Sequence, residues 1–109
     1  MLPLKYVIID NQIFMSRVQY HKDLVKVYGK EDSVISGGGY WAFDKEKEEI
    51  YFYSSSQEYG YVDKLIFFES MQNSEFTLKK FKGYKLYFSH FSLLSTMLGM
   101  INKEDFIII

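Results

Sequence analysis

The sequence contains no cysteine. This absence excludes a disulfide framework and any thiolate chemistry. No apolar run approaches the about 20 residues that a membrane-spanning helix needs. The opening residues "MLPLKYVIID" are too short and wrongly charged for a signal peptide. Together these features predict an intracellular, cytoplasmic protein without a membrane partner.

An excess of charge of either sign is also lacking. The chain has 13 Lys and Arg against 14 Asp and Glu, for a net charge of −1. A general nucleic-acid binder usually carries a basic stripe, so we do not expect a nucleic-acid partner, although a local basic pocket stays compatible with this balance. With two histidines and no cysteine, we predict no metal site.

What the chain does have is apolar and aromatic bulk. Its 109 residues fit one domain, residues 1–109, and 48% of them are apolar. Aromatic residues make up 19%. Bulky rings can fill the core of a small domain with few residues, and rings left on the surface can serve an interface.

Hydrophobic patterning and turn residues predict an alternation of strands and helices. The expected strands are residues 4–10, 12–19, 33–39, 40–44, 50–55 and 84–90, and the expected helices are 22–28, 74–83 and 91–100. Residues 61–71 fit either type, and the apolar tail 105–109 fits an edge strand or a partner contact. This order predicts one α+β domain, with a mixed or antiparallel sheet and helices packed on it.

Two stretches at one end of the expected hairpin, which turns near residues 45–48, are rich in small residues. They are Gly37-Gly38-Gly39 and the "YSSSQEYG" of residues 53–60. Either they are plain turns, or they bring the backbone close to an anion. Glycine allows positive φ and close approach, and turn N–H groups can form an anion-binding nest. No Gly-Lys-Ser/Thr follows the glycines, so this is not a Walker-type loop.

His21 and Lys5 are the candidate reactive side chains. His21 stands at the start of the expected 22–28 helix, where free N–H groups and a partial positive charge attract anions. A histidine there can act as a general acid or base near neutral pH, or it can be a plain capping residue. Lys5 opens the first strand and is otherwise an exposed strand-end lysine.

The order and spacing of these pieces resemble the phosphohistidine phosphatase family, also called Janus/Ocnus. That family shows a Lys-Tyr-Val strand, a Tyr-His-x-Asp helix start, three glycines and a Tyr-x-x-Ser-x-x-Tyr-Gly loop. The matching residues here are Lys5-Tyr6-Val7, Tyr20 to Asp23, Gly37 to Gly39, and Tyr53, Ser56, Tyr59 and Gly60. The resemblance covers about residues 4–60 and, more loosely, 76–88.

The resemblance implies a phosphatase that acts on P–N bonds without a metal or cofactor. His21 would be the general base, and Lys5 would help to bind phosphate. The N–H groups of His21 and Lys22 and of the loop around Ser56 and Glu58 would cradle the phosphate. The remaining pocket and loop positions are Gly37, Gly38, Gly39, Tyr40, Ser55, Gln57 and Tyr59. The substrate would be a phosphorylated protein or a small phosphoramidate.

Two residues depart from the family pattern. Tyr40 stands where the family often has arginine, and Glu58 brings a carboxylate close to the expected anion. Both favour the alternative that the chain is a non-catalytic module, which binds phosphate or a phosphoprotein or serves as an interaction surface. The aromatic surplus and the 105–109 tail suit a homodimer or another partner contact.

Overall fold

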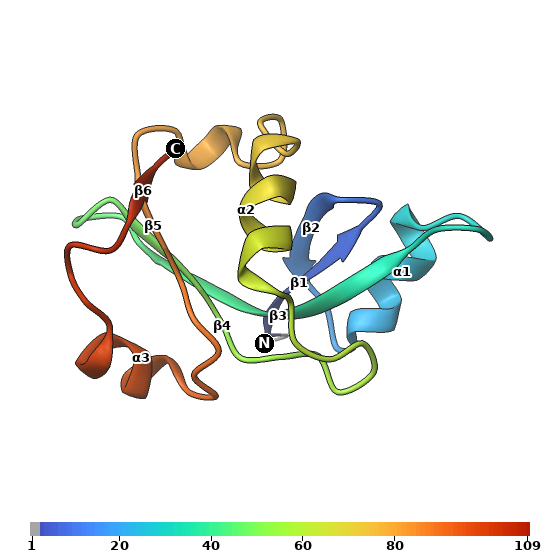
Figure 1. Cartoon of the computed structure of the whole chain (residues 1–109), viewed down its shortest axis with the longest axis horizontal. Helices are drawn as coiled ribbons and strands as arrows, with labels where there is room; N and C mark the ends of the chain where they lie inside the picture. Colours follow the sequence, from blue (N-terminus) through green and yellow to red (C-terminus); the bar gives the residue numbers. More distant parts are fainter. Residues whose placement is uncertain (1–2) are drawn as a thin grey trace.

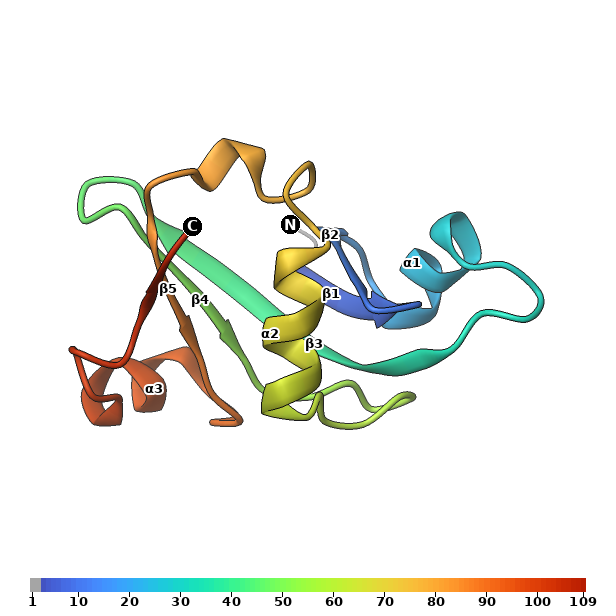
Figure 2. The ribbon, with the colours of Figure 1, turned by 45° about the horizontal axis from the view of Figure 1, so that its top comes forward.

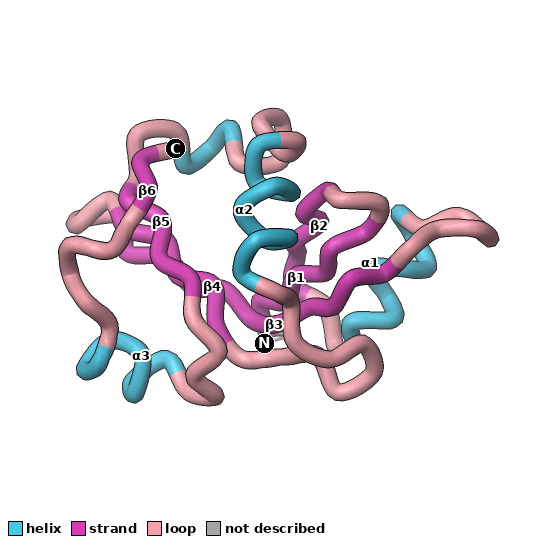
Figure 3. The backbone as a smooth tube through the Cα atoms, in the orientation of Figure 1, coloured by secondary structure: helices cyan, strands magenta, loops and turns pink. Residues whose placement is uncertain are grey.

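The computed structural model describes residues 3–109 (Figure 1). Within them the chain forms a mixed sheet of six strands with three helices, which confirms the α+β prediction (Figure 3). The elements in chain order are β1 (Leu4–Ile9), β2 (Gln12–Arg17), α1 (His21–Tyr28), β3 (Ile35–Asp44), β4 (Glu49–Tyr53), α2 (Lys64–Gln72), the short 3-10 helix η1 (Lys79–Phe81), β5 (Lys85–Phe88), α3 (Leu94–Met100) and β6 (Ile107–Ile108).

The strands lie in the order β2-β1-β3-β4-β5-β6. Neighbouring strands are antiparallel except β4 and β5, which are parallel. The β1–β2 hairpin turns at Asp10 and Asn11, whose φ angles are 50° and 59°. Two successive positive φ angles are typical of the tight turns that match the twist of a hairpin. The tail forms the edge strand β6, one of its two predicted outcomes.

The three glycines lie inside β3, so they belong to a strand, as the prediction for 33–39 had them, and the alternative of a plain turn is wrong. Gly37, Gly38 and Gly39 pair with Ile8, Val7 and Tyr6 of β1. Glycine is needed at these positions because neighbouring atoms leave no room for a side chain. A Cβ atom at Gly39 would lie 2.5 Å from the carbonyl oxygen of Tyr53 and 2.8 Å from a ring carbon of Tyr6. The predicted turn at residues 45–48 is confirmed.

The segment between β4 and β5 differs most from expectation. Residues 61–71 contain α2, which is capped by Asp63, whose carboxylate accepts the N–H groups of Leu65 and Ile66. The predicted helix over 74–83 is wrong: only the turn of η1 forms there. Ser74 does not cap a helix, because its hydroxyl accepts the N–H of Ile13 at 2.8 Å and donates to Ser70 O at 2.6 Å.

The helices cover both faces of the sheet. Along β1, Tyr6 and Ile8 pack into the cluster under α2, whereas Val7 and Ile9 pack with Leu24 of α1. Successive strand residues point to opposite faces, so α2 lies on one face and α1 on the other (Figures 1 and 2). Helix α3 packs through Met97 on Tyr51 and Tyr87, which lie on the face of α1.

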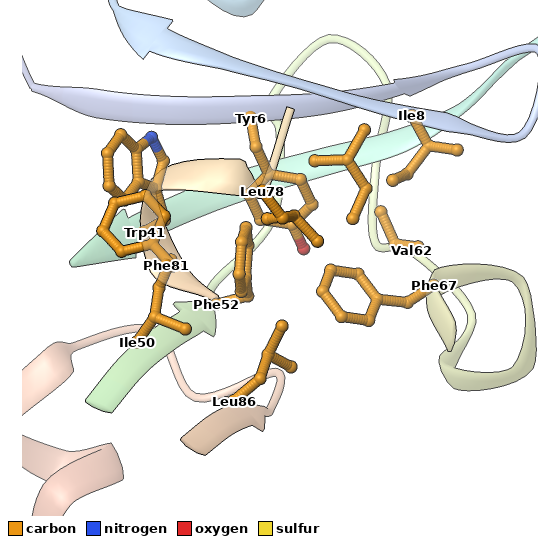
Figure 4. Packing of buried hydrophobic residues seen from close by; sticks show 11 residues of the cluster. Tyr6, Ile8, Trp41, Ile50, Phe52, Val62, Phe67, Leu78, Phe81 and Leu86 are labelled. Carbon is orange, nitrogen blue, oxygen red and sulfur yellow. The ribbon is translucent and has the colours of Figure 1, made fainter. Parts of the chain in front are cut away.

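The main core fills the space between α2, η1 and the sheet, as Figure 4 shows. Its buried members are Tyr6, Ile8, Ile13, Trp41, Ile50, Phe52, Val62, Phe67, Leu78, Phe81 and Leu86. Phe67 of α2 is its centre, with ring centroids 5.0 Å from Phe52 and 4.2 Å from Phe88. None of the described helices is both long and apolar enough to cross a lipid bilayer.

Candidate functional site

His21 is the first residue of α1, and its side chain is only 2% exposed. Its Nε2 atom lies 2.7 Å from the carbonyl oxygen of Gly39. A carbonyl oxygen can only accept a hydrogen bond, so we assign the ring proton to Nε2. The lone pair of the neutral ring is then on Nδ1, the nitrogen that could take a proton during a reaction.

The glycines of β3 make room for this imidazole. A Cβ atom at Gly38 would lie 3.0 Å from Cδ2 of His21 and 2.5 Å from the carbonyl oxygen of Tyr6. We expected these glycines to bring the backbone close to an anion, and the groups that lie close to Gly38 in the structure are the histidine ring and the neighbouring strand.

The surroundings of His21 hold its pKa below its usual value. Burial is the main cause, because it disfavours the charged ring. The hydrogen bond to Gly39 raises the pKa, the positive charge of Lys5 lowers it, and the negative charge of Glu58 raises it. The balance favours a neutral imidazole at neutral pH, which is the form that a general base needs.

Lys5 is a buried cation rather than an exposed strand-end residue. Its side chain is 8% exposed, and Nζ donates to the carbonyl oxygen of Gln19 at 2.6 Å. Nζ also lies 5.4 Å from the ring centre of Tyr40 and 5.8 Å from that of Tyr20. These contacts are cation–π interactions, and they hold the ammonium group within electrostatic range of His21.

The loop between β4 and α2 reaches the start of α1 (Figure 3). The backbone N–H of Lys22 donates to a carboxylate oxygen of Glu58 at 3.1 Å. Helix N-termini present unsatisfied N–H groups, and Glu58 satisfies one of them here. Glu58 acts through its side chain, whereas the resemblance implied a role for its backbone.

The same loop, residues 54–60, is held together by its own hydrogen bonds. Ser56 and Gly60 form a two-way backbone bridge, with N···O distances of 3.2 and 2.8 Å. The hydroxyl of Ser56, which is 3% exposed, accepts the N–H of Tyr59 at 3.1 Å. The carbonyl of Gly60 accepts the N–H of Gly38 at 3.2 Å. The serine loop and the glycines are therefore neighbours in space, as the sequence suggested.

Of the remaining predicted positions, only some contact His21 or its neighbours. The Tyr40 ring lies edge-on to the His21 ring, with centroids 5.8 Å apart. Tyr59 is half-buried and packs against the cluster of Val7, Ile9 and Leu24. Ser55 is half-buried and Gln57 is exposed. The structure thus brings Tyr40 to His21, and it gives Tyr59 a packing role.

Gln19 and Tyr20 help to hold Lys5, and the sequence did not identify either of them in this role. Gln19 supplies the carbonyl acceptor and Tyr20 supplies an aromatic face. Tyr20 is also the N-cap of α1, and its N–H donates to a carboxylate oxygen of Asp23 at 3.0 Å. The acid three residues after Tyr20 signals its N-cap position, because a side chain there often caps the start of a helix, but it does not signal the contact with Lys5.

Comparisons with known proteins do not assign the chain to a family. No protein-family model matches it, and a search of curated proteins finds no significant match. Within residues 3–109, no group of three or more His, Asp or Glu side chains is placed to hold a metal ion.

Proposed function

We propose that the start of α1 binds the phosphoryl group of a phosphohistidine or a small phosphoramidate and that the chain hydrolyses its P–N bond. The observation that carries the proposal is the grouping of a buried imidazole, a buried cation and a helix N-terminus. His21 is the first residue of α1 and interacts electrostatically with Lys5, whose Nζ bonds to the carbonyl oxygen of Gln19, two residues before the helix. This combination supplies a base and a set of donors for an anion.

In the proposed reaction, the oxygen of a water molecule forms a bond to phosphorus while the P–N bond breaks. Nδ1 of His21 takes a proton from the attacking water, the leaving nitrogen takes a proton from solvent, and His21 then returns its proton to solvent. A positioned general base contributes typically about 10²–10⁴-fold to such a reaction. Lys5 and the N–H groups of α1 stabilise the negative charge on the phosphoryl oxygens.

Glu58 favours a second candidate function, a phosphate-binding module without turnover. Its carboxylate already accepts the N–H of Lys22, which the phosphoryl group would use. A phosphate must displace this carboxylate, and two anions at the same place repel each other. A site without turnover, in which phosphate displaces the Glu58 carboxylate slowly, would still bind a phosphorylated partner.

The test is phosphate release from a phosphohistidine peptide and from phosphoramidate. We expect turnover by the wild type and a loss of about 10²-fold or more in His21→Ala. His90→Ala is the matched control, because His90 also places its Nε2 2.7 Å from a backbone carbonyl, that of Val62, on another part of the chain. That variant should keep full activity.

Two further outcomes separate the candidates. The binding module is identified if the wild type shows no turnover but phosphate raises its melting temperature. The rise should be smaller in Lys5→Met. Absence of both turnover and any phosphate-dependent stabilisation contradicts both functions. Equal turnover in the wild type and His21→Ala contradicts the role of His21.

A further inference from the structure

Strand β2 forms one outer edge of the sheet, and half of that edge is covered. The N–H of Ile13 points outward onto the hydroxyl of Ser74, and the side-chain amide of Asn73 donates to Asn11 O at 3.1 Å. Hydrogen-bonding direction alternates along an antiparallel strand, so the backbone groups of Met15 also point outward. Within residues 3–109 no strand lies beside this edge.

A groove of about 840 Å³ begins at this uncovered half of β2. We call it the edge groove. Its lining residues are Leu4, Phe14, Met15, Ser16, Arg17, Tyr28, Trp41, Phe43, Phe76, Thr77, Lys79, Lys80 and Phe81. Ligand-binding clefts typically have volumes of about 300–1,000 Å³, so the edge groove is large enough for several side chains. His21 does not line it.

The edge groove has an aromatic wall on each face of the sheet. On the face of α1, Phe14 stacks on Tyr28 with ring centroids 4.7 Å apart. On the face of α2, Trp41 and Phe81 meet at 5.8 Å. Side chains of a strand alternate between two faces, so a strand added beside β2 would direct successive side chains toward Phe14 on one face and toward Met15 on the other. On the face of Met15 the groove continues inward to Phe81 and to Trp41, which lies on β3, two strands from β2.

The charge of the edge groove has one sign. Its charged lining residues are Arg17, Lys79 and Lys80, and no Asp or Glu lines it, although the whole chain carries a net charge of −1. A second copy of this chain paired along β2 would bring the same cations close to each other. Charge complementarity therefore favours an acidic partner over self-association.

We propose that the edge groove binds an extended acidic segment of another protein, which adds as a strand beside Met15. Asp and Glu side chains of the segment contact Lys79 and Lys80, and its apolar or aromatic side chains pack on the two walls. The backbone of the segment bonds to the outward N–H and C=O of Met15. Backbone bonds supply affinity in this mode, and the alternating side chains supply specificity.

Trp41 makes this proposal measurable, because it is the only tryptophan of the chain and lines the edge groove. The probe is a capped hexapeptide, Glu-Phe-Asp-Val-Glu-Phe, titrated against Trp fluorescence. We expect a saturable change in fluorescence. A peptide in which lysine replaces each acid should bind at least about tenfold more weakly. N-methylation of the peptide backbone should also weaken binding by up to about tenfold, because it removes the donors of the added strand.

Variants of the chain test the same contacts from the other side. Lys79→Glu with Lys80→Glu should weaken acidic-peptide binding about tenfold, while Lys45→Glu with Lys47→Glu, in the β3–β4 turn, is the matched control. Met15→Pro removes an outward N–H at an edge-strand position, where proline is tolerated, together with a side chain that packs on the main core, so Met15→Ala is its control. The proline variant should bind the peptide more weakly than the alanine variant, and both should keep a thermal transition.

The results that would overturn the proposal are equally specific. Acidic and basic peptides that bind alike would exclude charge recognition, and an N-methylated peptide that binds like its parent would exclude strand addition. A Trp41 signal that does not respond to the acidic peptide would exclude the site. Tighter binding of a dT10 oligonucleotide than of the peptide would assign the groove to single-stranded nucleic acid instead.

Discussion

The carboxylate of Glu58 caps the backbone N–H of Lys22, at 3.1 Å, at the end of α1 where His21 lies. An acid of the chain itself thus occupies a donor that the proposed phosphate would use. The β4–α2 loop and the start of α1 are thereby linked, so any anion that binds there competes with this link.

Removal of the Glu58 charge should improve anion binding. Glu58→Gln keeps an oxygen acceptor for Lys22 but no longer repels phosphate. We expect phosphate to bind about two- to fivefold more tightly, the range of an exposed charge at a helix terminus. The dependence of the melting temperature on phosphate concentration measures this change. Glu46→Gln, in the β3–β4 turn, serves as the control, and equal phosphate affinity in the wild type and Glu58→Gln would contradict the competition.

Substitution at Gly38 should destabilise the protein and displace His21. In Gly38→Ala, the added Cβ meets the Tyr6 carbonyl and the His21 ring. Overpacking of this kind costs about 1–3 kcal/mol. Gly99→Ala in α3 is the matched control, because no atom lies within 4 Å of its added Cβ. That control should stabilise the protein by about 0.4–1 kcal/mol. Urea denaturation gives the free energy of unfolding of both variants. A Gly38→Ala variant as stable as the wild type would show that the neighbouring strands move to make room for the added methyl group.

The lowered pKa of His21 predicts a loss of stability on mild acidification. Above the ordinary histidine pKa of about 6.5, the ring is neutral in both the folded and unfolded chain. As the pH falls below that value, the unfolded chain takes up the proton first, so the free energy of unfolding decreases. Titration of the imidazole ring protons by NMR should give a midpoint below about 6.5. A midpoint above that value would contradict the burial argument.

Stability should depend strongly on the aromatic centre of the main core. Phe67 is fully buried and contacts the rings of Phe52 and Phe88. Phe67→Ala should therefore cost about 3–5 kcal/mol. Phe76 is 88% exposed. Phe76→Ala should change the free energy of unfolding by less than about 0.5 kcal/mol. Chemical denaturation of both variants decides the matter, and comparable losses would show that Phe76 packs more tightly than its exposure indicates.

Much of the fold could be predicted from local patterns. The alternating apolar strands near the N-terminus, the helix at 22–28 and the turn at 45–48 all follow from residue periodicity and turn residues. Helix α2 could not be settled, because its run "KLIFFESMQ" mixes aromatic and β-branched residues that also suit a strand. Asp63 directly before that run was the available N-cap signal.

Part of the grouping around His21 could be predicted from the sequence, whereas most of its contacts could not. The spacing of residues placed His21 at the helix start, and the shared hairpin end placed the serine loop close to the glycines. Burial of Lys5 depends on Gln19 and Tyr20 folding over it, which no local pattern reports. A strand and a turn could not be separated at the glycines, because the feature that requires glycine, space for His21 and Tyr6, arises only when the strands have packed.

The parallel pairing of β4 with β5 sets the order in which the sheet assembles. Hairpins β1–β2 and β3–β4 close over short turns and can form quickly, whereas β5 must wait until residues 54–84 have crossed the sheet. This late strand carries Phe88, which stacks on Phe67 of α2. Arrival of β5 therefore completes the core and fixes the crossover, and the edge strand β6 can pair only after it.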